Sequence, residues 1–376
     1  MGKNIKMKKT EDRICEAGIK ACILYNCTQD EIIYEYNKNL RLPMASVTKL
    51  ITALTVRECV PNPDKVFFTV DESCISYILD HSGSAAGFNL FIGESYSVTE
   101  YLKGLFISSG CDAAYMLAKN LGDGDDQAFV KKMNDFLTRI GCTDTHVTDA
   151  SGFENGKEHY TTVNDICRIM RLVMQDPLLR EILMTNCHIT ESKTQWTMRT
   201  IDPLLKCQSD AFFPYCLGGK TGTTPAAGRC YCGIFKRGGE EYIFAELGAD
   251  CDFSEKQRRW LAGHIIAGIF CDFLEESGPF MRVSFPGHYI VIPVGTAFKI
   301  EVQTLFNNTE EQPILSYFSL NPEIATVDKE GKITVCGKGV AQIEVYTQTG
   351  DYDLLFINST GEEYVELKRI DANHSF

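Results

Sequence analysis

Near the N-terminus, apolar and polar residues are arranged as two strands separated by a turn. Apolar runs occupy residues 19–26 and 31–37, with β-branched and aromatic side chains in both. The intervening residues 27–30, Cys-Thr-Gln-Asp, are short and mostly polar. This pattern predicts an antiparallel hairpin.

The middle of the chain has the apolar spacing of helices. After Pro43, the residues Val47, Leu50 and Leu54 recur at helical intervals, which predicts a helix with Ser46 at its N-terminus. Free backbone N–H groups at such a position favour a developing negative charge.

Further helices are expected between the predicted strands, as one helical subdomain. Ser97-x-x-Glu100 has the form of a capping box and predicts a helix through about residue 106. Ser108-Ser109-Gly110-Cys111 interrupts the pattern, so we expect Ser109 on a loop. Other helices are expected at about residues 112–122, 126–140 and 162–175.

The last third returns mainly to strands. Residues 230–235 and 241–247 are expected to form a hairpin, and about 254–275 a long helix that closes the first domain. A boundary is expected at Gly278-Pro279, followed by a β-sandwich over 279–360 and a polar, frayed tail over 361–376. The expected strands of the sandwich are 289–292, 297–302, 325–327, 332–335 and 342–346.

Composition limits the choice of partners. The 376 residues are enough for two domains, and a net charge of −13 argues against nucleic acid or an anionic membrane as the main partner. The sixteen cysteines are too sparse for a disulfide scaffold and lie mostly in apolar runs, so we interpret them as buried thiols. Their spacing indicates no zinc site, and we expect neither a metal nor a cofactor.

Targeting signals are weak in this sequence. Four lysines lie within residues 1–11, but no apolar segment of the kind found in signal peptides follows them. No stretch is long and apolar enough to predict a membrane span.

Three short motifs point to acyl transfer: Ser46-Val47-Thr48-Lys49, Ser109-Gly110-Cys111 and Lys220-Thr221-Gly222-Thr223. A serine attacks a carbonyl only if a neighbour accepts its proton and other groups hold the oxyanion. Three residues along a helix, a lysine shares the face of the serine. Each motif alone is weak, since the serine could cap a helix, the lysine could be a solvated surface group, and Lys-Thr-Gly could be a turn. Their order favours one site.

The set resembles the serine D-alanyl-D-alanine carboxypeptidases, the low-molecular-mass penicillin-binding proteins. Residues 41–50, 148–153 with 159–165, and 218–228 extend the resemblance, which covers about 15–275. It implies an α/β (α+β) fold of the penicillin-binding and β-lactamase kind, an antiparallel sheet flanked by helices. Residues 319–333 resemble a bacterial Ig-like domain of group 2, which implies a small β-sandwich used as a spacer or adhesion module.

The resemblance also implies a role for each motif residue. Ser46 would be the nucleophile, Lys49 its base and Ser109 the proton relay to the leaving amine. The backbone N–H groups of Ser46 and Thr223 would hold the oxyanion, and Arg199 is a weaker candidate for binding the carboxylate. The expected substrate-binding residues are Cys111, Lys220, Thr221, Gly222 and Thr223.

The activity implied is removal of the terminal D-alanine from peptidoglycan stem peptides through a serine acyl-enzyme. β-Lactams, which mimic the terminal dipeptide, would be covalent inhibitors. Enzymes of this kind act in the cell envelope or outside the cell, although no signal peptide is visible here.

Cys111 departs from the family pattern, in which the second motif usually ends in asparagine. A thiol donates and accepts hydrogen bonds less well than an amide. The enzyme could tolerate this change, its chemistry could be altered, or the protein could bind penicillin or cell wall without catalysis. A class A β-lactamase is another alternative, but it needs a Glu-x-x-Leu-Asn stretch, and the nearest one, residues 181–186, has the wrong spacing.

Overall fold

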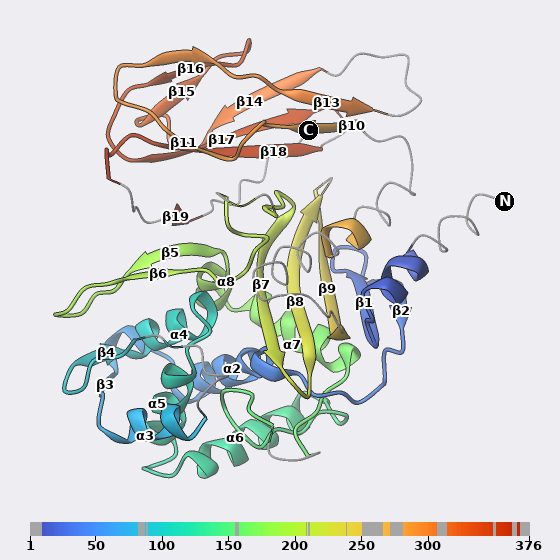
Figure 1. The fold of residues 1–376 in the computed structure, drawn as a ribbon, viewed down its shortest axis with the longest axis vertical. Coiled ribbons are helices and arrows are strands. Elements are labelled where there is room, and N and C mark those ends of the chain that lie inside the picture. Colours follow the sequence, from blue (N-terminus) through green and yellow to red (C-terminus); the bar gives the residue numbers. More distant parts are fainter. Residues whose placement is uncertain are drawn as a thin grey trace.

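The computed structural model describes most of the chain. The described residues are 10–81, 87, 89–154, 158–207, 209, 211–237, 239–249, 266–270, 281–306, 314–348, 351–362 and 367–368. They form a mixed α/β part and a β-sandwich, which lies above the upper ends of β7, β8 and β9 in Figure 1. The expected boundary at 278–279 lies outside the described residues.

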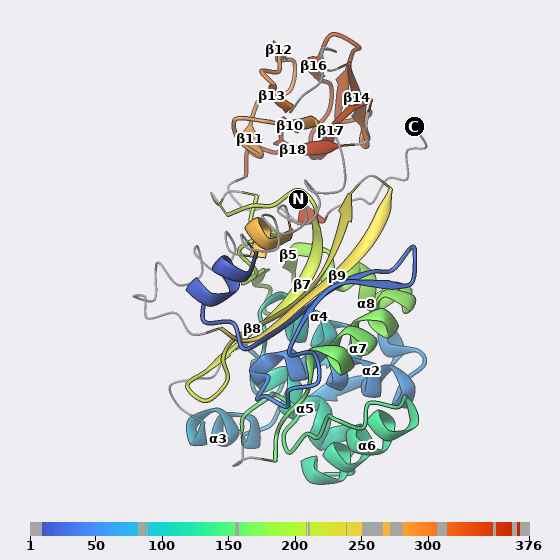
Figure 2. The same cartoon turned by 90° about the vertical axis from the view of Figure 1, so that its right-hand side faces the viewer.

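A five-stranded antiparallel sheet forms the centre of the α/β part, in the order β2-β1-β9-β8-β7. Its strands are β1 (Ala21–Asn26), β2 (Glu31–Tyr36), β7 (Cys216–Thr224), β8 (Gly228–Arg237) and β9 (Glu240–Ala249). The predicted N-terminal hairpin is therefore confirmed. The sheet twists strongly. Figure 2 shows α2, α5, α7 and α8 on one of its faces and the short helices at residues 10–16 and 266–270 on the other.

The helical half carries two of the three motifs. Its elements are the 3-10 turn η1 (Ala45–Thr48) and the helices α2 (Lys49–Cys59), α3 (Ser73–Asp80), α4 (Val98–Ile107), α5 (Cys111–Leu121), α6 (Asp126–Arg139), α7 (Val163–Gln175) and α8 (Pro177–Leu183). Helices α4 to α7 were predicted, and the Ser97 hydroxyl caps α4 as expected by accepting the Glu100 N–H. The prediction was imprecise at Ser46, which lies in η1, one turn before the α-helix proper.

Two small sheets flank the helices. Strands β3 (Phe67–Thr69) and β4 (Ser95–Ser97) pair with each other, and β5 (Thr185–Ile189) pairs with β6 (Thr197–Arg199). Strand β19 (Leu367–Lys368) adds to the free edge of β5. The prediction of a frayed tail is wrong for these two residues, because β5 offers them an unpaired edge far away in the sequence.

The C-terminal strands form the predicted sandwich. They are β10 (Met281–Ser284), β11 (Tyr289–Val291), β12 (Ala297–Lys299), β13 (Gln303–Phe306), β14 (Leu315–Ser319), β15 (Ala325–Val327), β16 (Lys332–Val335), β17 (Val340–Thr347) and β18 (Tyr352–Asn358). The main sheet has the order β11-β18-β17-β14, and β12-β16-β15 packs over it. Ile333, Ile343, Val345 and Ile357 belong to the enclosed core.

The outer face of β17 and β18 is covered by the α/β part. Tyr352, Leu354 and Phe356 belong to the same buried cluster as Phe213 and Phe270. Along β18, side chains that pack against the α/β part alternate with side chains that pack inside the sandwich. Both faces of the strand are therefore apolar. The two parts of the chain therefore share a hydrophobic core.

The cysteines in the described residues are free thiols, and Cys230 and Cys232 are buried under the helices. Of the predicted helix at 254–275, only 266–270 are described, and these are helical. No described helix has the length and apolar character needed to cross a bilayer.

Candidate active site

The first motif forms a short-range serine–lysine pair. Lys49 Nζ lies 2.8 Å from Ser46 Oγ, and it also contacts the Ser151 carbonyl at 2.7 Å and Cys111 Sγ at 3.4 Å. Lys49 is fully buried, whereas Ser46 is partly exposed. When the amine is neutral, its two N–H bonds can point to the carbonyl and the thiol, which leaves the lone pair for the Ser46 hydroxyl proton.

The backbone around Ser46 is held in an uncommon conformation. Ala45 has a φ of 47°, in the left-handed region that few residues other than glycine adopt. The Thr48 hydroxyl donates to the Ala45 carbonyl at 2.7 Å, and His159 Nε2 lies 2.8 Å from that hydroxyl. Because the Thr148 N–H donates to His159 Nδ1, the neutral ring carries its proton on Nε2 and donates to Thr48. His159 therefore supports the turn that presents Ser46.

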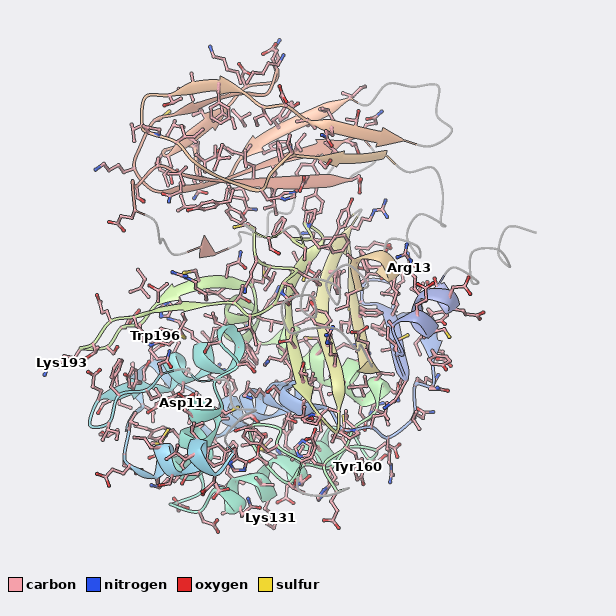
Figure 3. The ribbon with its side chains drawn as sticks, viewed as in Figure 1. Arg13, Asp112, Lys131, Tyr160, Lys193 and Trp196 are labelled. Atoms are coloured by element: carbon pink, nitrogen blue, oxygen red, sulfur yellow. The ribbon has the colours of Figure 1, made fainter. Side chains whose placement is uncertain are left out.

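The second motif lies at the break between α4 and α5. Ser109 is buried and also has a left-handed φ, 57°, and Cys111 is the first residue of α5. The next residue, Asp112, is labelled in Figure 3 on the helical side of the molecule. Lys220 Nζ, from the third motif, donates to Ser109 Oγ at 2.8 Å. The site therefore contains two serine–lysine pairs.

The third motif lies on β7, which is an edge strand of the central sheet. A Cβ placed on Gly222 would come within 2.8 Å of the Met44 carbonyl and 3.0 Å of the Ser46 nitrogen. Only glycine allows the strand to approach Ser46 so closely. Thr221 and Thr223 flank this point. Thr221 is partly exposed and Thr223 is exposed, so both can be reached by a ligand at the strand edge.

The electrostatics of the site favour an anion. Both amines are buried, and in the described part of the chain no carboxylate lies within ion-pair distance of either. Burial, and next the charge of Lys49, lower the pKa of Lys220 well below its usual value. The charge interactions with Cys111 and, next, with the buried Asp202 partly oppose this shift in the pKa of Lys220.

The loop at residues 149–153 places the Ser151 carbonyl against Lys49. Asp149 Oδ1 accepts the N–H groups of Ser151, Gly152 and Phe153, and Asp149 Oδ2 accepts the Tyr77 hydroxyl at 2.8 Å. These bonds fix the Ser151 carbonyl against Lys49. The available signal was the family-like stretch 148–153, which indicated importance but not this contact.

Two other residues considered in the sequence lie on elements outside the three motifs. Arg199 is exposed at the end of β6, in the hairpin that Trp196 marks in Figure 3. Glu181 is exposed on α8.

Comparison with known proteins agrees with this geometry. The family model described as D-alanyl-D-alanine carboxypeptidase matches residues 7–251. The chain belongs to this family. It is therefore a serine peptidase of the carboxypeptidase type, and the predicted family, fold class and enzymatic activity are confirmed.

Similar proteins are found in several bacteria. A D-alanyl-D-alanine carboxypeptidase of Streptomyces sp. strain K15 is 30% identical over 223 residues, which are 56% of this chain and 74% of the relative. The DacF carboxypeptidase of Bacillus subtilis is 29% identical over 248 residues, 64% of this chain and 60% of the relative.

A solved structure shares the fold of the α/β part. A mutant of the Streptomyces K15 DD-transpeptidase matches with a TM-score of 0.59 at 25% identity and covers 67% of this chain and 98% of its own. A model described as an intimin immunoglobulin-like domain matches residues 311–349, within the sandwich.

Proposed function

We propose that this carboxypeptidase removes the terminal D-alanine of peptidoglycan stem peptides through an acyl-enzyme on Ser46. The observation that carries the proposal is the 2.8 Å contact between the partly exposed Ser46 Oγ and the buried Lys49 amine, next to the open edge of β7. A peptide bound along that edge presents a carbonyl to the hydroxyl.

In the acylation step, Ser46 Oγ attacks the penultimate D-alanine carbonyl and Lys49 takes the hydroxyl proton. The backbone N–H groups of Ser46 and Thr223 stabilise the oxyanion, since Gly222 brings the strand against the Ser46 nitrogen. The C–N bond then breaks, and the nitrogen of the leaving D-alanine needs a proton.

Ser109 and Lys220 provide that proton. The Ser109 hydroxyl gives its own proton to the leaving amine and is resupplied by Lys220 Nζ at 2.8 Å. A lysine whose pKa is lowered by burial gives up a proton readily, which suits this role. At this point Lys49 holds the proton from Ser46 and Lys220 has lost one, so Lys49 must pass its proton on and Lys220 must regain one before deacylation. The neutral Lys49 then accepts a proton from the attacking water and returns it to Ser46 Oγ as the ester bond breaks, which releases the shortened peptide.

The terminal carboxylate would be bound by Lys220, Thr221 and Thr223, and Cys111 would contact the acyl portion beside Lys49. The two buried amines, which have no carboxylate within ion-pair distance among the described residues, support this assignment. A β-lactam places its own carboxylate and carbonyl in the same positions and would acylate Ser46. Because the proposed substrate is a peptidoglycan peptide, the enzyme would act in the cell envelope.

The sandwich over residues 279–360 is proposed as a module that packs against the α/β part around Phe213 and Phe270. The core that it shares with the α/β part supports a fixed position rather than a flexible tether. It would hold the catalytic part at a set distance from whatever the sandwich contacts.

The test is D-alanine release from diacetyl-Lys-D-Ala-D-Ala. We expect turnover by the native enzyme and none above background by Ser46→Ala. Nitrocefin separates the β-lactamase alternative, for which fast steady-state hydrolysis would be required. A protein that binds penicillin but releases no D-alanine would support the non-catalytic alternative.

A further inference from the structure

The proposed function fixes the direction of the substrate along β7. The acyl part of the peptide runs toward the C-terminal end of that strand. In the proposed function the terminal carboxylate meets Lys220, Thr221 and the Thr223 side chain, and the scissile carbonyl lies at the Thr223 N–H, beside the point where Gly222 contacts the Ser46 nitrogen. The acyl part of the peptide must therefore continue past Thr223 toward Thr224. At about 3.3 Å per residue, the residue that precedes the two D-alanines lies beside Thr224.

An acidic side chain lies at this end of the groove. Glu154 Oε1 accepts the Thr224 hydroxyl at 2.5 Å. That hydroxyl is already oriented, because it accepts the Ala227 N–H at 3.0 Å and so points its own proton at Glu154. Glu154 itself is only partly buried.

The Glu154 carboxylate is oriented by its loop and has no cationic partner among the described residues. The Asp149 bonds to Ser151, Gly152 and Phe153 fix the loop up to the residue before Glu154. Among the described residues, no lysine or arginine lies within ion-pair distance of Glu154, and Oε2 makes no hydrogen bond that the structure records. A preorganised, partly exposed carboxylate of this kind is suited to an ammonium or guanidinium group of a ligand.

We propose that Glu154 is a specificity-determining residue, which binds the cationic side chain of the amino acid preceding D-Ala-D-Ala. The inference rests on the proposed function, since it takes the orientation of the peptide from the roles of Lys220 and Ser46. The preferred substrates are then peptides whose third residue is a diamino acid with a free ω-amine. Peptides in which that amine is acylated lose the contact.

The experiment compares two peptides that differ only at this amine. Nα-acetyl-Lys-D-Ala-D-Ala carries the free ε-amine, and the Nα,Nε-diacetyl peptide does not. We expect the native enzyme to favour the free amine about five-fold in kcat/KM, the upper range for a partly exposed ion pair. In Glu154→Gln this ratio falls to about one, and added salt lowers it in the native enzyme.

A matched control removes the same charge nearby. Glu158→Gln alters an exposed carboxylate of the same segment and keeps the native ratio. An unchanged ratio in Glu154→Gln overturns the inference. An equal loss of kcat/KM on both peptides also overturns it, because it would show that Glu154 stabilises the loop or activates water instead of binding the amine. If no variant releases D-alanine from either peptide, the proposed function has failed, and this inference fails with it.

Discussion

The sulfur of Cys111 lies 3.4 Å from the amine of Lys49, so the thiol occupies a position where the family usually has an amide. The Cys111 Sγ otherwise contacts only the Ser109 carbonyl, at 3.9 Å, among the described residues. Lys49, the proposed base, therefore has one weak hydrogen-bond partner beside two strong ones.

We expect Cys111→Asn to retain or raise turnover of diacetyl-Lys-D-Ala-D-Ala. An amide oxygen accepts an N–H bond from Lys49 better than a thiol, and the amide N–H can donate to the substrate. Steady-state kinetics and the rate of penicillin acylation are the measurements. Abolished acylation would show that the thiol has a specific role of its own.

His159 predicts acid sensitivity of the fold. Burial lowers the pKa of His159 from 6.5 to about 4, against a smaller opposing effect of Asp149. Between pH 6.5 and 4 the unfolded chain therefore binds a proton that the folded protein does not bind. The free energy of unfolding falls as the pH falls through this range. The loss approaches about 3 kcal/mol at pH 4.

Urea unfolding at pH 7 and pH 4.5 measures this effect. His159→Gln is expected to be less stable than the native protein at pH 7, because the contact with Thr48 is weakened, but to lose less stability on acidification. A variant with the full acid sensitivity of the native enzyme would rule out His159 as the source.

Glu246 predicts the opposite pH dependence. It is buried on β9, Oε2 has no hydrogen-bond partner among the described residues, and burial raises its pKa from 4.5 to about 8. The folded protein keeps a proton that the unfolded chain loses between pH 4.5 and 8, so stability falls as the pH rises through that range. Glu246→Gln removes this cost, which is on the order of 4 kcal/mol at pH 8.

Thermal unfolding of Glu246→Gln at pH 5 and pH 8.5 checks the sign. The gain in Tm is expected to be small at pH 5 and largest at pH 8.5. An equal change in Tm at both values would mean that the carboxyl group is not the titrating element.

The contact between the two parts of the chain also has a measurable consequence. Asp351, at the start of β18, accepts bonds from the Tyr215 hydroxyl and, at 3.1 Å, from Arg237 Nε. Asp351 is 3% exposed and Arg237 is 12% exposed at the side chain. Asp351→Ala leaves the guanidinium without this partner and is expected to cost about 3 kcal/mol.

The measurement is urea unfolding followed at separate probes in each part. Because the core is shared, we expect a single transition that moves to lower urea in Asp351→Ala. Glu330→Gln, at an exposed position of the sandwich, serves as the control. A midpoint unchanged in Asp351→Ala, or two separate transitions in the native protein, would contradict a fixed interface.

The local parts of this architecture could be predicted from sequence, and the parts that depend on distant contacts could not. The i to i+3 spacing of Ser46 and Lys49 guarantees their proximity on any helical turn, so the pair was predictable. The Ser151 carbonyl and the His159 ring reach the site through loops whose course depends on packing. The sequence indicated only that Ser151 and His159 lie in family-like segments, not that they contact the site.

Strand β18 illustrates the same limit in the sandwich. Its residues 352–358 are buried on both faces, so the alternation expected of a strand with one exposed face is absent. The cause is the α/β part that covers its outer face, which no local pattern reveals. The pairing of β19 with β5 was missed for the same reason.

The direct test of the whole account is labelling by a fluorescent penicillin, with the modified residue located by mass spectrometry of the digested protein. We predict one penicilloyl group on Ser46 in the native enzyme and no label in Ser46→Ala. Equal labelling of both proteins, or a label carried by another side chain, would contradict the assignment of the nucleophile and every step built on it.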